Sequence, residues 1–259
     1  MLKTRIIPCL LLRNESLVKT VQFKKFGYIG DPANTCRIFN ELEVDELAFL
    51  DITASKENRE PNYKILREIA NECFMPLSYG GGIRSIQMAE KIFNIGFEKI
   101  VLNSYPFEYP NIISELSQAF GSQSIIIAID VKKNFFGKYE IFSLSGTVNQ
   151  KKKPVDWAKE VQNLGAGEIL LTSIDHEGTW KGFDIDLTKQ VADAVSIPVI
   201  AHGGSGNIAH IGEACNIGHA SAVAIGSMVV YQKQGMGVLV NFPDKKHLSK
   251  VIGSLLSQR

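Results

Sequence analysis

The chain has 259 residues, of which 45% are hydrophobic and 21% charged, and a formal net charge of +1 at pH 7. This length and composition suit one large globular domain, and α/β barrels commonly have this size. The small net charge excludes a general electrostatic attraction to nucleic acid or membrane surfaces. Apolar runs all fall short of the ~20 residues needed to span a membrane.

The cysteines at positions 9, 36, 73 and 215 are far apart in the sequence and form no CxxC pair. We therefore expect neither a zinc site nor a disulfide framework. The histidines, including His202, lack a convincing metal-ligand spacing. We expect a cytoplasmic protein without a metal or another cofactor.

Short apolar runs recur along the chain, as expected for strands that are buried on both faces. They cover residues 5–12, 46–52, 75–79, 99–104, 124–130, 168–173, 197–201 and 221–227. Helix-period segments lie between most of them, with Asp31 and Pro32 at one helix start and Ser85 and Gly96 bounding another. This alternation predicts a (β/α)8 TIM barrel, as a single domain over residues 1–259. A doubly wound open sheet is the alternative, and the number of strands favours the barrel.

The two halves of the sequence resemble each other. The stretch MPLSYGGGIRSIQMAEKIFNIG at 75–96 matches IPVIAHGGSGNIAHIGEACNIG at 197–218. We interpret this as a half-barrel repeat. In this repeat, Leu11, near the end of the first strand, corresponds in sequence to Asp130, at the end of the fifth.

Residues 13–30 and 131–153 break the regular spacing. We expect two long loops on the C-terminal face, where barrel enzymes keep their active sites, and a hairpin turning at Gly137 within the second.

Glycine-rich turns follow two of the predicted strands, at 80–82 and 202–207. Glycine lets backbone N–H groups approach an anion, and the following helix N-terminus adds positive partial charge. Asn103 and Ser104 lie beside Gly82, and Ser227 lies beside Gly203 and Gly204. The pair of turns predicts two phosphate sites across the barrel mouth, for a ligand phosphorylated at both ends. Tight strand-to-helix turns without a ligand are the alternative.

Carboxylates stand at the ends of three predicted strands, at Asp51, Asp130 and Asp175. An Asp that leaves an apolar strand into a concave site is a candidate general acid or base. Asp130 is the strongest candidate because its surroundings offer no local capping role, whereas Asp175 fits a loop cap.

Charged residues begin four predicted strands: Arg5, Glu46, Lys99 and Glu168. They would meet at the N-terminal end of the barrel, where buried charges must be paired. A structural salt-bridge ring and the entrance to an axial passage are both consistent with this pattern.

With RIIPCL, GDP, DELAFLDITAS, GGGIRS, FGSQSIIIAID, LGAGEILLTS, DLTKQVADAV and IPVIAHGGSGN in collinear order, the chain resembles HisF, the cyclase subunit of imidazole glycerol phosphate synthase. The resemblance implies a (β/α)8 barrel that docks a HisH-like glutaminase and conducts ammonia along its axis.

The resemblance also implies roles for individual residues. Arg5, Glu46, Lys99 and Glu168 match the ammonia gate, and Glu98 the glutaminase interface. Gly82, Asn103 and Ser104 match one phosphate site, Gly203, Gly204 and Ser227 the other, Lys19 the mobile-loop lysine, and Asp130 one of two catalytic aspartates.

The chain departs from the family pattern at Leu11, where the second catalytic aspartate is expected. The loop after the fifth strand and Glu177, where Asp is frequent, also differ. This combination is similar to HisF-like paralogues of bacterial surface-glycan clusters, in which a third protein, an amidotransferase, uses the ammonia to amidinate a nucleotide-activated sugar. An authentic histidine-pathway cyclase and a non-catalytic scaffold for the glutaminase remain the alternatives.

Overall fold

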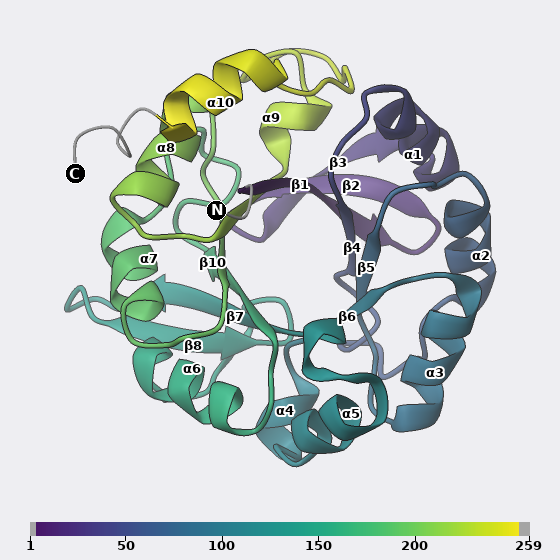
Figure 1. The fold of residues 1–259 in the computed structure, drawn as a ribbon, viewed down its shortest axis with the longest axis vertical. Helices are drawn as coiled ribbons and strands as arrows, with labels where there is room; N and C mark the ends of the chain where they lie inside the picture. Colours follow the sequence, from purple (N-terminus) through teal and green to yellow (C-terminus); the bar gives the residue numbers. More distant parts are fainter. Residues whose placement is uncertain (1–3, 254–259) are drawn as a thin grey trace.

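A closed barrel of parallel strands forms the centre of the computed structural model, which describes residues 4–253 (Figure 1). In chain order the barrel strands are β1 (Arg5–Arg13), β4 (Leu47–Asp51), β5 (Leu77–Gly80), β6 (Lys99–Leu102), β7 (Ile125–Lys133), β10 (Glu168–Ser173), β11 (Val199–His202) and β12 (Ala222–Ile225). Each strand pairs with the next, and β12 pairs with β1 to close the ring. The predicted TIM barrel is confirmed, and the open sheet is wrong.

Short helices cover the outside of this ring. They are α1 (Pro32–Glu41), α2 (Tyr63–Asn71), α3 (Ile86–Ile95), α4 (Tyr105–Glu108), α5 (Ile112–Phe120), α6 (Pro154–Asn163), α7 (Ile185–Ala192), α8 (Ile208–Asn216), α9 (Ser227–Val230) and α10 (Lys245–Gly253), with a 3-10 turn at Ser122–Ser124. The predicted caps are present: Asp31 accepts a 2.8 Å hydrogen bond from the backbone N–H of Asn34, and Gly96 ends α3 with a φ of 119°. Within residues 4–253, every helix is too short or too polar to cross a membrane.

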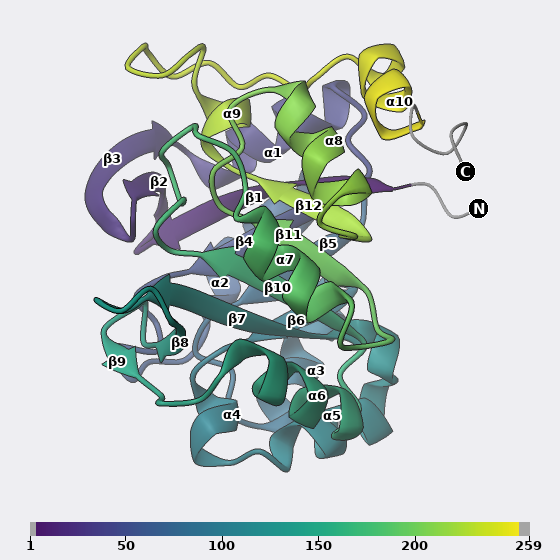
Figure 2. The same ribbon diagram turned by 90° about the vertical axis from the view of Figure 1, so that its left-hand side faces the viewer.

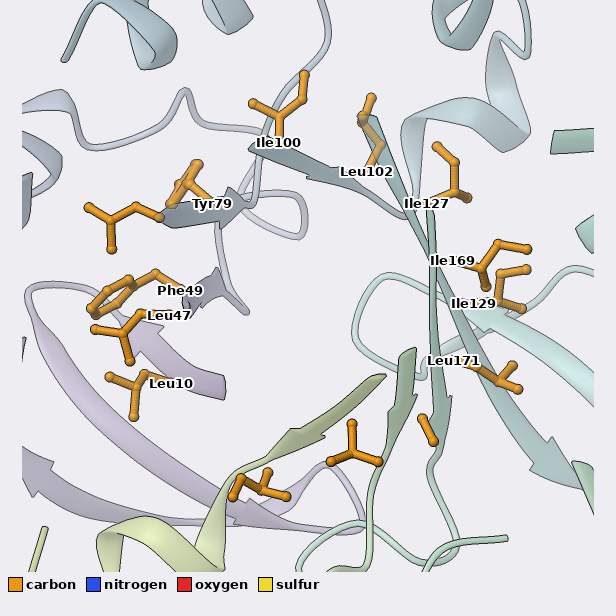
Figure 3. Packing of buried hydrophobic residues seen from close by; sticks show 14 of the residues in the cluster. Leu10, Leu47, Phe49, Tyr79, Ile100, Leu102, Ile127, Ile129, Ile169 and Leu171 are labelled. Atoms are coloured by element: carbon orange, nitrogen blue, oxygen red, sulfur yellow. The ribbon is translucent and has the colours of Figure 1, made fainter. Parts of the chain in front are cut away.

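Side chains alternate along the barrel strands between the helices and the barrel axis. The outward set includes Leu10, Phe49 and Ile127, which pack in the layer between strands and helices (Figure 3). The inward set forms a separate apolar cluster of Ile7, Cys9, Ala48, Val101, Ile126, Ala128, Leu170, Ile200, Ala222 and Ala224. The continuous apolar runs of the sequence are therefore explained by burial on both faces.

Residues 13–30, which we predicted as a loop, are mostly strand. β2 (Ser16–Val21) pairs antiparallel with β1 and with β3 (Lys24–Gly30). The turn between them has Gln22 at a φ of 53° and Phe23 at 60°. Hairpin turns of this kind favour Asn and Gly, so the usual turn signal is absent from the sequence and the hairpin was missed.

The predicted hairpin at Gly137 is present between β7 and β8 (Tyr139–Ser143), and β9 (Val148–Asn149) pairs with β8. β2, β3, β8 and β9 lie together at one end of the barrel, on the left in Figure 2. This is the end at which the parallel strands finish. Each half of the barrel thus begins with a nine-residue strand followed by antiparallel strands, as a half-barrel repeat requires.

The layer between barrel and helices should contribute most of the stability. The Phe49 side chain is 0% exposed, whereas Phe135, at the tip of the second hairpin, is 97% exposed. We expect Phe49→Ala to lower the free energy of unfolding by about 3–5 kcal/mol, and Phe135→Ala, the matched control, to change it by less than about 0.5 kcal/mol. Urea unfolding of both variants measures this, and similar losses would contradict the assignment of the core.

Candidate functional site

A closed ring of four charges lies at the N-terminal end of the barrel. Arg5 contacts Glu46 at 2.7 Å and Glu168 at 3.0 Å. Lys99 contacts the same two carboxylates, Glu46 at 3.4 Å and Glu168 at 3.1 Å. The four residues predicted as a gate are therefore brought together, with positive and negative charges alternating around the ring.

Attraction between the buried positive and negative side chains stabilises the ring. Glu46 is 4% exposed at its side chain, and a carboxylate so buried is tolerated only when it is paired. Burial alone would lower the pKa of Arg5, but the carboxylates of Glu168 and Glu46 raise it above its ordinary value, so Arg5 stays charged. One oxygen of Glu168, Oε2, is buried without a hydrogen-bond partner among the described residues. The ring therefore keeps one spare hydrogen-bond acceptor.

Next to this ring, the barrel interior is apolar. Ala222 is in register with Arg5, and Ala224 is in register with Ile7 two residues further along β1. The side chains of the inward cluster, including Ala48 and Leu170, are small or aliphatic. An apolar column of this kind disfavours ions far more than small neutral molecules, because an ion loses its hydration there.

A cavity opens at the other end of the column. Leu11 and Asp130 both line it, together with Asn103, Thr172 and His202. These two matched positions come from β1 and β7, which lie four strands apart in the eight-strand ring. The sequence comparison of Leu11 with Asp130 thus corresponds to two opposite walls of one cavity.

The environment of Asp130 shifts its pKa toward neutrality. Burial, opposed by a hydrogen bond with Thr172 that lowers the pKa, raises the pKa of Asp130 to about 7. The negative charge of the nearby Glu177 raises it further. The amide of Asn103 donates to Asp130 Oδ2 at 3.2 Å. A carboxyl with a pKa near 7 can both donate and accept a proton at neutral pH. The predicted candidate therefore has suitable chemistry.

His202, which also lines the cavity, has its pKa shifted in the direction opposite to that of Asp130. Burial and the neighbouring Lys19 lower the pKa of His202 to about 3, so its imidazole is neutral at physiological pH. Its Nδ1 lies 3.1 Å from the hydroxyl of Thr172. A fixed neutral imidazole in this place orients neighbours rather than carrying charge.

The residues of the first predicted phosphate site line the same cavity. Gly82 has a φ of 72°, and a Cβ there would lie 2.5 Å from the carbonyl oxygen of Arg59. Asn103 also donates to the Ala128 carbonyl at 3.1 Å, and Ser104 accepts from the N–H of Leu144 at 3.1 Å. The structure brings this set together, and it shows that Gly82 is required by the close backbone approach even without a ligand.

The second predicted phosphate site forms a smaller pocket, lined by Gly203, Gly204, Ser227, Lys19 and Glu177. Lys19 lies on β2 rather than in a loop, and only 4% of its side chain is exposed. Its ammonium is 3.4 Å from Glu177 Oε1. A Cβ at position 226 would lie 2.4 Å from the Lys19 nitrogen, so glycine there makes room for the lysine.

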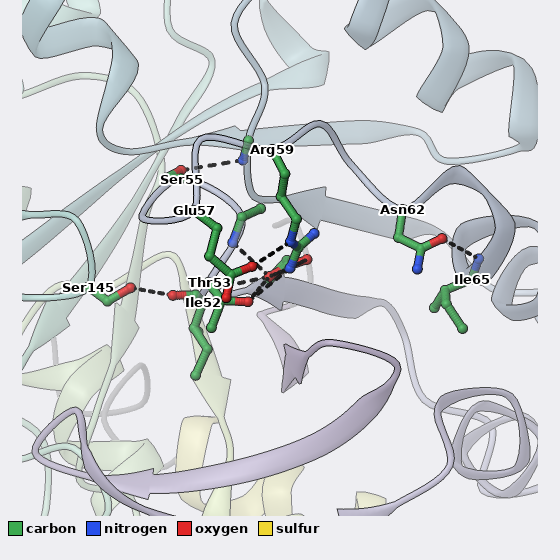
Figure 4. A network of polar contacts seen from close by, with 11 residues as sticks. Ile52, Thr53, Ser55, Glu57, Arg59, Asn62, Ile65 and Ser145 are labelled. Carbon is green, nitrogen blue, oxygen red and sulfur yellow. Dashed lines mark hydrogen bonds and ion pairs between the residues drawn. The ribbon is translucent and has the colours of Figure 1, made fainter.

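Asp51 holds the loop after β4, whose polar network around Thr53 and Arg59 is drawn in Figure 4. One oxygen accepts from the backbone N–H groups of Thr53 and Ala54, each at 3.0 Å, and the other lies 2.8 Å from Arg59. A carboxylate with these partners fixes a loop and is not a free general base. Asp175, which we expected to cap its own loop, accepts from the backbone N–H of Lys133 on β7 at 2.8 Å.

Arg59 and Glu177 are the two site-forming residues whose contacts the sequence did not reveal. Glu177 holds the tip of the first hairpin: its carbonyl accepts from Gln22 at 2.9 Å and its carboxylate from the N–H of Phe23 at 3.2 Å. The strained turn is therefore supported from the loop after β10. Apart from its unusual identity at a family position, Glu177 carries no sequence signal for this contact.

Glu98, predicted at a partner interface, is exposed directly before β6, at the same end of the barrel as the charged ring. Within residues 4–253, the structure contains no group of three or more His, Cys, Asp or Glu side chains that could hold a metal ion.

Comparison with known proteins identifies the family. The family described as "Histidine biosynthesis protein" matches residues 5–235. A Pseudomonas aeruginosa protein named "Putative imidazole glycerol phosphate synthase subunit hisF2" is 47% identical over 248 residues, which cover 96% of this chain and 99% of that protein. The chain belongs to the HisF family.

Two further relatives carry similar names. A HisF subunit protein of Leptospira borgpetersenii is 46% identical, over 94% of this chain and 96% of its own length. A hisF3 subunit protein of Vibrio vulnificus is 43% identical, over 97% of each chain. The HisF likeness thus covers almost all of the barrel.

The raised pKa of Asp130 predicts a pH-dependent stability. An acid whose pKa rises on folding from 3.8 to about 7 binds more protons in the folded than in the unfolded state, so stability falls as pH rises through that window. Between pH 5 and pH 8, the free energy of unfolding of Asp130→Asn should rise by up to roughly 2 kcal/mol relative to that of the unsubstituted chain. Urea unfolding at both pH values measures this. A carboxyl midpoint near pH 4 in a carbon-13 NMR titration would contradict it.

Proposed function

We propose that this HisF-family chain is the synthase subunit of a glutamine amidotransferase complex. It conducts ammonia from a HisH-like glutaminase to an amidotransferase that forms an acetamidino group on a nucleotide-activated surface-glycan sugar. The observation that carries the proposal is the pairing of an intact charged ring with Leu11 at the opposite end of the same strand, β1.

The ring and the column suit ammonia. Arg5, Glu46, Lys99 and Glu168 exclude bulk ions by presenting both signs of charge, while the spare oxygen of Glu168 can accept an N–H donor. The apolar column then favours neutral ammonia over ammonium, whose desolvation is costly. Exposed Glu98, beside the ring, would contribute to the glutaminase interface.

The cavity, in contrast, lacks half of an acid–base pair. Leu11 lines it at 5% exposure, and an aliphatic side chain cannot transfer a proton. General acid–base catalysis contributes about 10²–10⁴-fold in rate, so loss of one carboxylate makes the chain a poor cyclase. Ammonia that leaves the column would pass on to the third protein. Gly82, Asn103, Ser104, Gly203, Gly204 and Ser227 would bind phosphate groups of a ligand at the mouth.

Replacing the missing carboxylate tests this proposal. With free ammonia and the ribonucleotide substrate of the cyclase, we expect the unsubstituted chain to turn over very slowly. Leu11→Asp should then raise the rate by at least about 10²-fold. Leu11→Asn, which matches Asp in size but carries no acid, is the control and should give no gain. Robust turnover by the unsubstituted chain would overturn the proposal.

An authentic cyclase of histidine biosynthesis is the second candidate. The names of the relatives and the pKa of Asp130 near neutrality favour it. Under this reading the unsubstituted chain is active and Asp130→Asn abolishes formation of imidazole glycerol phosphate. The same assay therefore separates the two candidates.

Blocking the column tests ammonia transfer separately from the chemistry at the mouth. Ala222→Leu adds bulk beside Arg5 inside the barrel, whereas Ala220→Leu adds the same bulk in the outer layer. We expect only Ala222→Leu to reduce glutamine-driven product formation, by roughly tenfold, equivalent to about 1.4 kcal/mol in the barrier. Product formation with added ammonium should be retained in both variants. Unchanged glutamine-driven product formation in Ala222→Leu would instead favour the scaffold reading.

A further inference from the structure

Two cysteines that are distant in the sequence meet on the outside of the barrel. Cys36 lies on α1 and is fully buried, and Cys73 lies just beyond the end of α2 and is partly exposed. Both pack on the layer between barrel and helices. Each thiol affects the pKa of the other, and Cys73 Sγ lies 3.7 Å from the carbonyl oxygen of Met75. The wide sequence spacing, which led us to expect no cysteine pair, is bridged by the packing of α1 against α2.

An asparagine holds this contact from both sides. Asn40 is one turn beyond Cys36 on α1 and therefore lies on the same helix face. Its amide N–H donates to the carbonyl of Glu72 at 2.5 Å, and its oxygen accepts from the N–H of Phe74 at 3.1 Å. These are the residues on either side of Cys73. The backbone of Cys73 is thus fixed opposite Cys36.

The two thiols are unequal. The neighbouring Cys36 thiol lowers the pKa of Cys73, against the opposing effect of burial, whereas the Cys73 thiol and burial raise the pKa of Cys36. Cys73 is also the accessible partner, because it is partly exposed whereas Cys36 is fully buried. A thiolate is the reactive form of cysteine, so Cys73 is the site at which an oxidant would react first.

We propose that Cys36 and Cys73 form a redox-active dithiol, which a hydroperoxide converts into an intramolecular disulfide between α1 and the end of α2. In a reducing compartment the pair stays as two thiols, and a cytosolic disulfide of this kind is transient. The site is separate from the charged ring and from the cavity, and does not depend on the function proposed above.

The reaction has two steps. The Cys73 thiolate attacks the terminal peroxide oxygen, the O–O bond breaks, and the alcohol or water leaves after taking up a proton, so that Cys73 becomes a sulfenic acid. Cys36 then attacks the Cys73 sulfur. An S–S bond forms, the S–O bond breaks, and water leaves with the thiol proton of Cys36. The two thiols supply the two electrons that reduce the peroxide.

The experiment exposes the full chain to stoichiometric hydrogen peroxide and maps its cysteines by mass spectrometry without reduction. We expect loss of two of the four thiols, recovery of a Cys36–Cys73 cross-linked peptide, and return of both thiols with dithiothreitol. In Cys36→Ser, Cys73 should instead accumulate a sulfenic acid that dimedone traps. In Cys73→Ser, the remaining Cys36 should no longer react rapidly with hydrogen peroxide.

Cys215→Ser is the matched control, since burial raises the pKa of the partly exposed Cys215 to about 11. Its disulfide yield should equal that of the unsubstituted chain, and Cys73 should react at least about tenfold faster than Cys215. Near-ultraviolet circular dichroism of the oxidised chain should show retained tertiary structure. The proposal is overturned if Cys215 is oxidised first, if no Cys36–Cys73 peptide forms, or if that peptide appears only after unfolding.

Discussion

Along each barrel strand, alternate side chains face the helices and the axis, and closure of the ring confines the inward set to a narrow column. A charged residue that points into this column is stable only where it meets a partner of opposite sign. The ring of Arg5, Glu46, Lys99 and Glu168 satisfies that condition with four contacts of 2.7–3.4 Å. The ring thereby ties β1, β6, β10 and the residue before β4 together at the base of the barrel, and the inward residues of these strands lie above it.

The inward positions at the mouth differ between the two halves of the barrel. On β7 the inward sequence ends in Asp130, whose environment brings its proton affinity close to neutrality, while on β1 it ends in Leu11. The halves of the barrel have similar backbones but unequal ends. A conduit needs only the shared part, the ring and the column, whereas proton transfer from both walls needs a carboxylate at each end. Under the proposed function, this difference is what separates ammonia transfer from ring closure in this chain.

The sequence was informative where local patterns carry the structure. Apolar runs gave the barrel strands, and Asp31, Ser85 and Gly96 gave helix ends, because these signals depend on neighbours along the chain. It failed where contacts are made across space. The turn at Gln22 and Phe23 depends on Glu177 from another loop, Asp51 depends on Arg59, and Cys73 depends on Asn40 and Cys36 from a different helix. Positions that the family resemblance assigned to phosphate groups were brought together, but Lys19 proved to be buried on a strand beside Glu177.

The first hairpin also has an evolutionary consequence. Its turn places two residues without glycine's freedom at positive φ, and it persists through contacts that one residue, Glu177, makes with Gln22, Phe23 and Lys19. A shorter acid at position 177 would lose contact with at least one of these groups. A residue larger than glycine at position 226 would displace the Lys19 ammonium from its present position. The hairpin tip, position 177 and position 226 should therefore change together in evolution. A substitution at one of them limits which residues the other two can tolerate.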